Sequence, residues 1–574
     1  MSNRKIFIRG YTSCLVLALI FGSGALLQKY PAVIITTEPI SATTQTLYTN
    51  IQEITSMIQM QSETDQHMLD EFNSGTYTQD EPLVIVNPYE ISPLTAIVLF
   101  KSSEPVQVSV RIQGVDEASS VAYLYEDYSI DHILPIYGLY PGVVNTVTLT
   151  LINATTQKQV KILKIETDRL STDLAMNQLS ITKSNLPISP GFTFSYRNGF
   201  SSTAKTAFDL NGDYRWYLTK NYLTSGSYDL GRRLVLSLGD PYGPIILVEM
   251  NYLGKILKAY YSPYGNHHDI AVTDNRLIIT GSNNSPNTIE DFVYAIDRST
   301  GDVTQRLSYL GMLDRTRHYG YFYSNKDWMH MNSVIEYEGD LIVSSNHQSS
   351  IIRNDWDGNI KWILGDPTFY TTGLKRYVLK PIGKDFLYPY NQHAAEILPD
   401  TDGNPDTVDL LLFDNGYSRY IVDDQLQYQI SAHLRSQPEL FSRMVHYQIN
   451  EKDMTVRQIW QYGQNRPELF AQTRGDANLL SNGNFLGSFF SDRTLNGITT
   501  QRSVYVEVDA AQRVVWECVA TSSNFQNSYV EYKAERFEIY NSDTAVLNLR
   551  LRAQNFIPSD LLSKAGVNSA LQRN

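Results

Sequence analysis

The sequence repeats one short pattern along most of its length, and this repeat limits the possible folds more than any other feature. Each copy is a strand, a turn rich in glycine, asparagine or aspartate, and a second strand that carries aromatic residues. Six copies lie at 208–218, 248–261, 294–309, 354–364, 447–462 and 506–519. Such turns connect β-hairpins, and repeated hairpins bury their apolar faces against their neighbours. The pattern therefore predicts a six-bladed β-propeller over residues 191–545.

A second pair of strands precedes four of these hairpins. The first strand of each pair begins at His268, His330, His393 or Gly475. We expect these to be the inner strands, where each blade meets the central channel. Tryptophans follow the turn in four hairpins, and we expect them to pack the blades. They are Trp216, Trp362, Trp460 and Trp516.

Three of the inner strands begin with histidine in the same register. Each histidine lies four residues before an apolar core position of its strand. The pairs are His268 and Val272, His330 and Val334, and His393 and Ile397. Blades related by rotation about one axis bring such imidazoles to one level, facing the channel. Because the chain has only 10 histidines, three in one register indicate a functional site.

Two kinds of chemistry suit this histidine triad. Three imidazoles could hold a metal ion with open positions. Alternatively, one imidazole could act as a nucleophile while the others donate protons or bind anionic oxygens. The neighbouring donors favour the second chemistry, since we expect no inward-facing carboxylate beyond Asp269, which strand alternation turns away from His268. The candidate donors to substrate are Asn332, Asn346, His347, Arg443 and Arg502.

The segments before the repeat, and the tail after it, have other sequence patterns. Residues 1–30 carry basic residues before a short apolar run, which predicts an export signal or a membrane anchor. Residues 31–80 form a linker with a helix over about 44–72, either a stalk for self-association into a homo-oligomer or a helix laid on its own domain. Alternating strands over 81–153 predict a small β-sandwich domain, and residues 154–190 connect it to the repeat. Residues 546–574 form a C-terminal tail.

Composition and charge exclude one class of partner. The formal net charge is −13 and no Lys/Arg-rich run is present, so we expect no nucleic-acid partner. Outside the export signal the only cysteine is Cys518, which we expect to be a small buried apolar side chain. We expect an extracytoplasmic protein, periplasmic if the signal is removed and anchored at the cell surface or membrane if it is kept.

Several long motifs in the chain resemble those of the bacterial arylsulfate sulfotransferases. They include HHD at 267–269, DWMHMNS at 327–333, SSNHQ at 344–348, NQHAAEIL at 391–398, LFDNG at 412–416 and YKAERF at 532–537. The resemblance runs from about residue 82 to about residue 540. It implies an all-β protein with an N-terminal β-sandwich and a six-bladed β-propeller. It also implies transfer of a sulfuryl group from a phenolic sulfate donor to a phenol acceptor, without the nucleotide donor PAPS, a metal or another cofactor.

The resemblance also implies roles for individual residues. His393 matches the nucleophilic histidine, which becomes transiently sulfated in a ping-pong mechanism. His268 and His330 match two further active-site histidines, with His268 chosen over His267 by its register. Asn332 matches a polar partner in the same site.

One departure from the family pattern bears on activity. Similar enzymes have an arginine, which holds the sulfuryl oxygens, where this chain has Asn346. Either another cation replaces it, with Arg443 and Arg502 as candidates, or the chain is a weakened or substrate-shifted paralogue. A metal-dependent hydrolase or lyase and a non-catalytic binding propeller stay open as alternatives.

Overall fold

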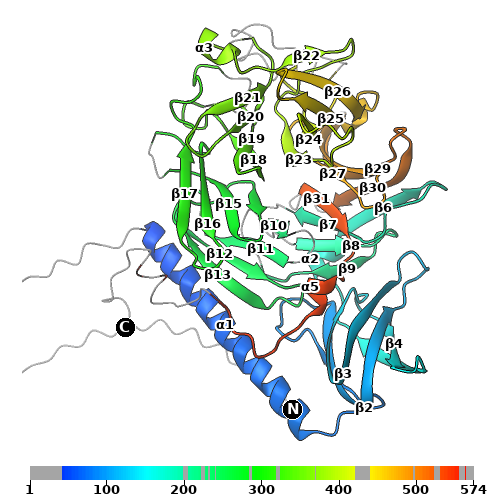
Figure 1. The fold of residues 1–574 in the computed structure, drawn as a ribbon. Helices are drawn as coiled ribbons and strands as arrows, with labels where there is room; N and C mark the ends of the chain where they lie inside the picture. Colours follow the sequence, from blue (N-terminus) through cyan, green and yellow to red (C-terminus); the bar gives the residue numbers. More distant parts are fainter. Residues whose placement is uncertain are drawn as a thin grey trace, which may run out of the picture. The chain divides into compact units, whose positions relative to one another are not determined.

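The computed structural model describes most of the chain from residue 42 onward, and all of that part lies in one compact unit, Ala42–Asn574. The described residues are 42–197, 205–220, 226–229, 233–239, 241–283, 287–317, 324–368, 370–419, 440–495, 498–522, 531–554, 561 and 563. The predicted signal or anchor at 1–30 lies outside them. None of the helices within these ranges is both long enough and apolar enough to cross a membrane. Strands dominate the described chain, which confirms the all-β prediction (Figure 1).

One long helix, α1 (Ala42–Ser74), precedes the strands (Figure 1). Its buried face includes Ile51 and Ile54, spaced as one side of a helix requires. The Gln61 amide donates to the Gly254 carbonyl at 2.8 Å and accepts from the Ile256 amide at 2.9 Å. Of the two predicted roles, the structure supports a helix laid on its own domain. The short helices are α2 (Thr172–Ala175), α3 (Thr372–Lys375), η2 (Pro467–Leu469) and α5 (Ser542–Ala545).

The first sheet contains five strands in the order β1-β2-β4-β5, with β3 also paired to β2. The strands are β1 (Leu83–Val86), β2 (Thr95–Ile112), β3 (Val121–Tyr137), β4 (Val144–Asn153) and β5 (Lys158–Glu166). Side chains of β2 and β4 alternate between buried and partly exposed over much of their length, as a half-buried sheet requires. Strand β5 falls in the segment predicted to be a connector. It carries three lysines and is mostly exposed, and Ile165 near its end is buried.

Six further sheets follow: each has a core of four antiparallel strands, and two of them carry a fifth strand at one edge. The first is β10 (Gly226–Asp229), β11 (Arg233–Leu238), β12 (Ile245–Met250) and β13 (Ile256–Ser262). The second is β14 (Ile270–Val272), β15 (Arg276–Gly281), β16 (Phe292–Asp297) and β17 (Val303–Ser308). The third is β18 (Met331–Tyr337), β19 (Asp340–Ser345), β20 (Ser350–Asn354) and β21 (Ile360–Leu364).

The remaining three sheets draw on distant parts of the chain. The fourth is β23 (His393–Ile397), β24 (Thr407–Asp414), β25 (Arg443–Asn450) and β26 (Thr455–Tyr462), with β22 (Lys380–Ile382) parallel to β26. The fifth is β27 (Asp476–Leu479), β28 (Phe485–Leu495), β29 (Ile498–Val508) and β30 (Val514–Ser522), extended by β6 (Asn177–Lys183). The sixth joins β31 (Glu531–Phe537) to β7 (Phe192–Arg197), β8 (Lys205–Phe208) and β9 (Tyr214–Tyr217).

Each hairpin of the sequence repeat forms the third and fourth strands of one of these six sheets, which confirms the predicted hairpins. The four strands predicted upstream of the hairpins also form, as β14, β18, β23 and β27, and each is the first in chain order of the four core strands of its sheet. The first strands β10, β14, β18, β23, β27 and β31 contact one another in that order. Because β31 begins the sheet that β7 continues, the start and the end of the repeated region share one sheet.

The repeated tryptophans connect neighbouring sheets. The Trp216 indole N–H donates to the Tyr252 carbonyl at 2.7 Å, in the hairpin turn of the next sheet. Three other tryptophans make the same kind of bond. Trp362 donates to the Glu451 carboxylate at 2.5 Å, Trp460 to the Ala510 carbonyl at 3.0 Å and Trp516 to the Leu210 carbonyl at 3.0 Å. The last bond joins the fifth sheet to the sixth. In all four bonds, the hairpin turn of one sheet accepts a hydrogen bond from the tryptophan of the sheet before it.

We expect Trp216→Phe to lower the thermal unfolding midpoint more than Trp460→Phe. Both variants lose the same type of hydrogen bond, but Trp216 is fully buried and Trp460 is only half-buried. A buried carbonyl without its donor costs about 1–3 kcal/mol, whereas water replaces the donor at an accessible site. Thermal denaturation followed by circular dichroism measures the difference. Equal shifts for the two variants would contradict a stabilising role for the buried bond.

Candidate active site

Three histidines lie at the beginning of three successive first strands. His268 lies two residues before β14, His330 lies directly before β18, and His393 is the first residue of β23. The backbones of His268 and His330 have φ of 58° and 48°, a left-handed conformation that non-glycine residues adopt at a cost. Their ring centroids are 4.7 Å apart. The structure therefore brings these two predicted site residues into contact.

Tyr532 connects this pair to His393. Its ring stacks on His268 with 5.4 Å between centroids and meets His393 edge-on at 6.0 Å. Tyr532 belongs to β31, the first strand of the sixth sheet. Four residues after Tyr532 comes Arg536 rather than an apolar residue, so the register that marks the histidines does not mark Tyr532.

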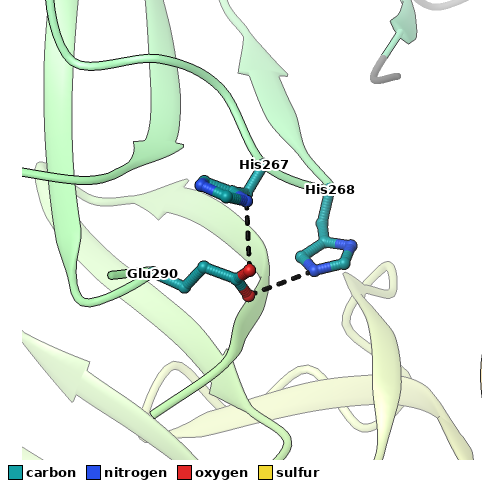
Figure 2. A group of neighbouring side chains, drawn as sticks. All are labelled: His267, His268 and Glu290. Carbon is teal, nitrogen blue, oxygen red and sulfur yellow. Dashed lines mark hydrogen bonds and ion pairs between the residues drawn. The ribbon is translucent and has the colours of Figure 1, made fainter. Parts of the chain in front are cut away.

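A buried carboxylate, Glu290, lies at the centre of the histidines, and this corrects the expectation that no such group is present. Its oxygens lie 3.2 Å from His267 Nδ1, 3.3 Å from His268 Nε2 and 2.9 Å from His330 Nδ1 (Figure 2 shows the first two). Glu290 lies in the loop between β15 and β16, outside the repeated register, so no sequence pattern marked it. Asp269 instead binds Lys533 Nζ at 2.7 Å.

Glu290 sets the charge of the neighbouring imidazoles. Burial alone would lower the pKa of His330, but the carboxylates of Glu290 and Asp327 outweigh burial and raise that pKa well above 6.5. Burial would likewise raise the pKa of Glu290, yet His330 and the three imidazole hydrogen bonds hold it well below its usual range. At neutral pH the two therefore form a buried ion pair. Burial lowers the pKa of His268, against its hydrogen bond to Glu290.

His393 has a different environment. Burial lowers its pKa to about 3, against the hydrogen bond to Asn415 and with help from the charges of His268, His330 and Arg474. Its Nδ1 lies 2.7 Å from Asn415 Oδ1. The Asn415 amide group donates to the carbonyls of Ala471 at 2.8 Å and Arg474 at 2.6 Å, so its oxygen must face the imidazole. Nδ1 therefore carries the proton, and Nε2 keeps its lone pair.

Three predicted donors hold the site together through hydrogen bonds to backbone. Asn332 donates to the Gln392 carbonyl at 2.7 Å, directly before His393. Asn346 donates to the Asn391 carbonyl at 2.9 Å and accepts from the Tyr417 hydroxyl at 3.1 Å. The His347 ring stacks on His330 at 4.7 Å, and its Nδ1 donates to the Asp327 carbonyl at 2.7 Å.

The two predicted arginines bind other partners. Arg443 is fully buried, pairs with Asp414 at 2.8 Å and donates to Gln458 Oε1 at 2.8 Å. Arg502 donates to the Glu468 carbonyl at 2.9 Å. Among the described residues, neither arginine makes a hydrogen bond or ion pair with His268, His330 or His393.

Two groups of side chains here have the composition of a metal site. One is His267, His268 and Glu290, and the other is Asp327, His330 and His347. Within each group the ligand atoms lie within 4.8 Å of one another. Imidazole and carboxylate suit zinc or iron, so both groups could hold such an ion.

The comparison with protein families decides the identity of the chain. The family model described as arylsulfotransferase (ASST) matches residues 177–533, more than half of the chain. The chain belongs to the arylsulfotransferase family. A second model, the arylsulfotransferase Ig-like domain, matches residues 83–168, which covers strands β1 to β5. This arylsulfotransferase is thus an enzyme for sulfuryl transfer between phenols, in agreement with the motifs of its sequence.

Two curated relatives are arylsulfate sulfotransferases AssT. The protein from Lelliottia amnigena is 24% identical, over 67% of this arylsulfotransferase and 80% of the relative. The protein from Escherichia coli O6:H1 strain CFT073 has the same identity and coverage. Among solved structures, a variant of the Synechocystis apocarotenoid oxygenase covers 82% of this chain and 98% of its own, at 9% identity. Its TM-score of 0.30 is too low to bear on the fold.

We expect Glu290→Gln to lower the pKa of His330. Removing the carboxylate removes one of the two negative charges beside His330, so the imidazolium loses its proton at lower pH than in the wild type. Histidine-labelled NMR titration measures the shift. Glu338→Gln, which changes an acid that is 64% exposed and paired with Arg353, is the matched control. A wild-type His330 that titrates at or below 6.5 would contradict the buried ion pair.

Proposed function

We propose that this arylsulfotransferase moves a sulfuryl group from a phenolic sulfate ester to a phenol by a ping-pong reaction through a sulfated His393. The observation that carries the proposal is the protonation state of His393. Its Nδ1 proton is held by Asn415, and a low pKa of about 3 leaves Nε2 unprotonated at neutral pH. A neutral imidazole with a directed lone pair is the form that a nucleophilic histidine needs.

We further propose that the six repeated sheets are the blades of a β-propeller. Two observations support this arrangement: the first strands contact one another in sequence order, and the tryptophans link consecutive sheets. The histidines would then face a central channel from three neighbouring blades. The basic and apolar residues at 1–30 support an extracytoplasmic location.

In the first half-reaction, the lone pair of His393 Nε2 bonds to sulfur and the bond between sulfur and the aryl oxygen breaks. The bond electrons leave with the phenolate oxygen, which takes a proton from the His330 imidazolium. The sulfated ring of His393 is positively charged, and its Nδ1–H still donates to Asn415 Oδ1. His330 is better suited than His268 to be the acid, because its pKa is raised while that of His268 is lowered.

In the second half-reaction, an acceptor phenol gives its proton to the now neutral His330, and its oxygen attacks sulfur. The bond between sulfur and Nε2 breaks, and its electrons return to His393. Each turnover restores both histidines, so no proton or cofactor is consumed. Phenols have a pKa near 10, which makes phenolate a far better leaving group than an alkoxide. The flat Tyr532 ring between His268 and His393 supports binding of an aromatic group.

We expect wild-type protein incubated with para-nitrophenyl sulfate to gain the mass of one SO₃ and to release para-nitrophenol in a burst. His393→Ala should show neither, because it lacks the nucleophile. Intact mass spectrometry measures the gain. His67→Ala, which removes a side chain that is 79% exposed on α1, is the control. A variant without His393 that transfers sulfuryl as fast as wild type would rule out the covalent step.

The pH dependence should form a broad plateau around 6.5, the ordinary pKa of histidine. His393 must be neutral to attack, so its activity is lost only as pH falls towards about 3. His330 must be protonated to donate, so activity is lost as pH rises through its raised pKa. Steady-state kcat/KM across pH measures both limbs, and Glu290→Gln should move the alkaline limb to lower pH. An acid limb centred at 6.5 would contradict the assignment of His393.

Metal-dependent hydrolysis is the second candidate, favoured by the two groups of potential ligands around Glu290 and Asp327. The two functions differ in their response to chelation. Sulfuryl transfer through His393 should persist after extended dialysis against EDTA. Activity that disappears on dialysis and returns with added zinc would support the metal-dependent function instead.

A further inference from the structure

We propose that Arg474 provides the positive charge that binds the sulfuryl oxygens, the role left unfilled by the neutral Asn346. This inference rests on the proposed function, because it assigns a ligand for the group that His393 transfers. A sulfuryl group in transfer spreads negative charge over three peripheral oxygens. A fixed cation beside His393 Nε2 would stabilise that charge without reorganisation at the moment of reaction.

The side chain of Asn346 has other contacts. Its amide group donates to the Asn391 carbonyl, and its oxygen accepts from the Tyr417 hydroxyl. The side chain is also neutral and 4% exposed. Arg443 and Arg502 hold Asp414 and the Glu468 carbonyl, respectively. Lys533 is paired with Asp269 at 2.7 Å.

Arg474 is placed by its backbone next to the nucleophile. It lies two residues before β27, with a left-handed φ of 64°. Its carbonyl accepts the Asn415 amide at 2.6 Å, and the oxygen of the same Asn415 side chain binds His393 Nδ1. Only one side chain therefore separates the Arg474 backbone from the imidazole that attacks sulfur.

The turn after Arg474 is closely packed. Gly475 has φ of 118°, and a Cβ at this position would lie 2.3 Å from the Phe413 ring. Only glycine fits there, so the direction of the chain at Arg474 is fixed. The guanidinium carbon lies 5.1 Å from the centre of the Phe490 ring, a distance typical of a cation–π contact.

The charge of Arg474 affects the pKa values of two residues of the site. It contributes to lowering the pKa of His393 and opposes the rise in the pKa of Tyr532, which burial causes. A guanidinium stays protonated at all physiological pH and presents parallel N–H groups that match two oxygens of a tetrahedral anion. The same charge that binds the sulfuryl oxygens also keeps the nucleophile unprotonated. Arg474 as a whole is half-buried.

Arg474→Ala tests the proposal, because it keeps the carbonyl that holds Asn415 and removes the charge. We expect kcat/KM for para-nitrophenyl sulfate to fall by roughly 10²-fold, the usual cost of one donor to a developing oxyanion. Arg474→Lys should retain more activity, and added guanidinium chloride should restore part of the activity of Arg474→Ala. Arg513→Ala, which removes an arginine that is 62% exposed, is the matched control.

Binding of inorganic sulfate gives a readout that does not need turnover. We expect wild type and Arg513→Ala to bind sulfate with similar Kd by calorimetry, and Arg474→Ala to bind it more weakly. Unchanged sulfate binding by folded Arg474→Ala, or unchanged kcat/KM, would overturn the role of Arg474. Sulfate binding that depends on Arg474 in a wild type unable to transfer sulfuryl would instead overturn the proposed function and leave the anion site in place.

Discussion

Hydrogen bonds from tryptophan to the turn of the next sheet join the third, fourth, fifth and sixth sheets in order, and the sixth to the first. Each joins two consecutive sheets at their outer hairpins, and the bond from Trp516 to Leu210 joins the end of the repeat to its beginning. Indole N–H groups in a packed interior need an acceptor, so each sheet has a defined position relative to its neighbour. Trp362 thus joins the third and fourth sheets, whose first strands begin next to His330 and at His393.

The site contains one imidazole that is positively charged at neutral pH, His330, and one that is neutral, His393. Glu290 holds His330 as an imidazolium, whereas burial keeps His393 neutral against its hydrogen bond to the uncharged Asn415 side chain. A carboxylate in place of Asn415 would raise the pKa of His393 and remove its lone pair from the reaction. The proposed acid and the proposed nucleophile thus differ in the charge of their hydrogen-bond acceptors and in the effect of burial. The chemistry of each depends on a residue from another part of the chain.

Much of the fold could be predicted from the sequence, because repeated hairpins, turn residues and strand register are local patterns. The hairpins, the inner strands and the meeting of His268 with His330 follow from these patterns. The site was predicted less completely. Glu290 lies in a loop outside the repeat, and Arg474 lies just before a strand whose register position is taken by Gly475. The imidazoles that contact Glu290 lie more than 20 positions away along the chain.

The sequence by itself determined that the chain is built from repeated antiparallel strands and that its histidines share a register, since both depend on spacing along one strand. Its motifs also predicted the enzyme family. Only the tertiary structure decided which imidazole is charged and which nitrogen of His393 keeps its lone pair. These properties depend on burial and on contacts between residues more than 20 positions apart, such as His393 with Asn415 and His330 with Glu290. Spacing along the chain does not encode such contacts.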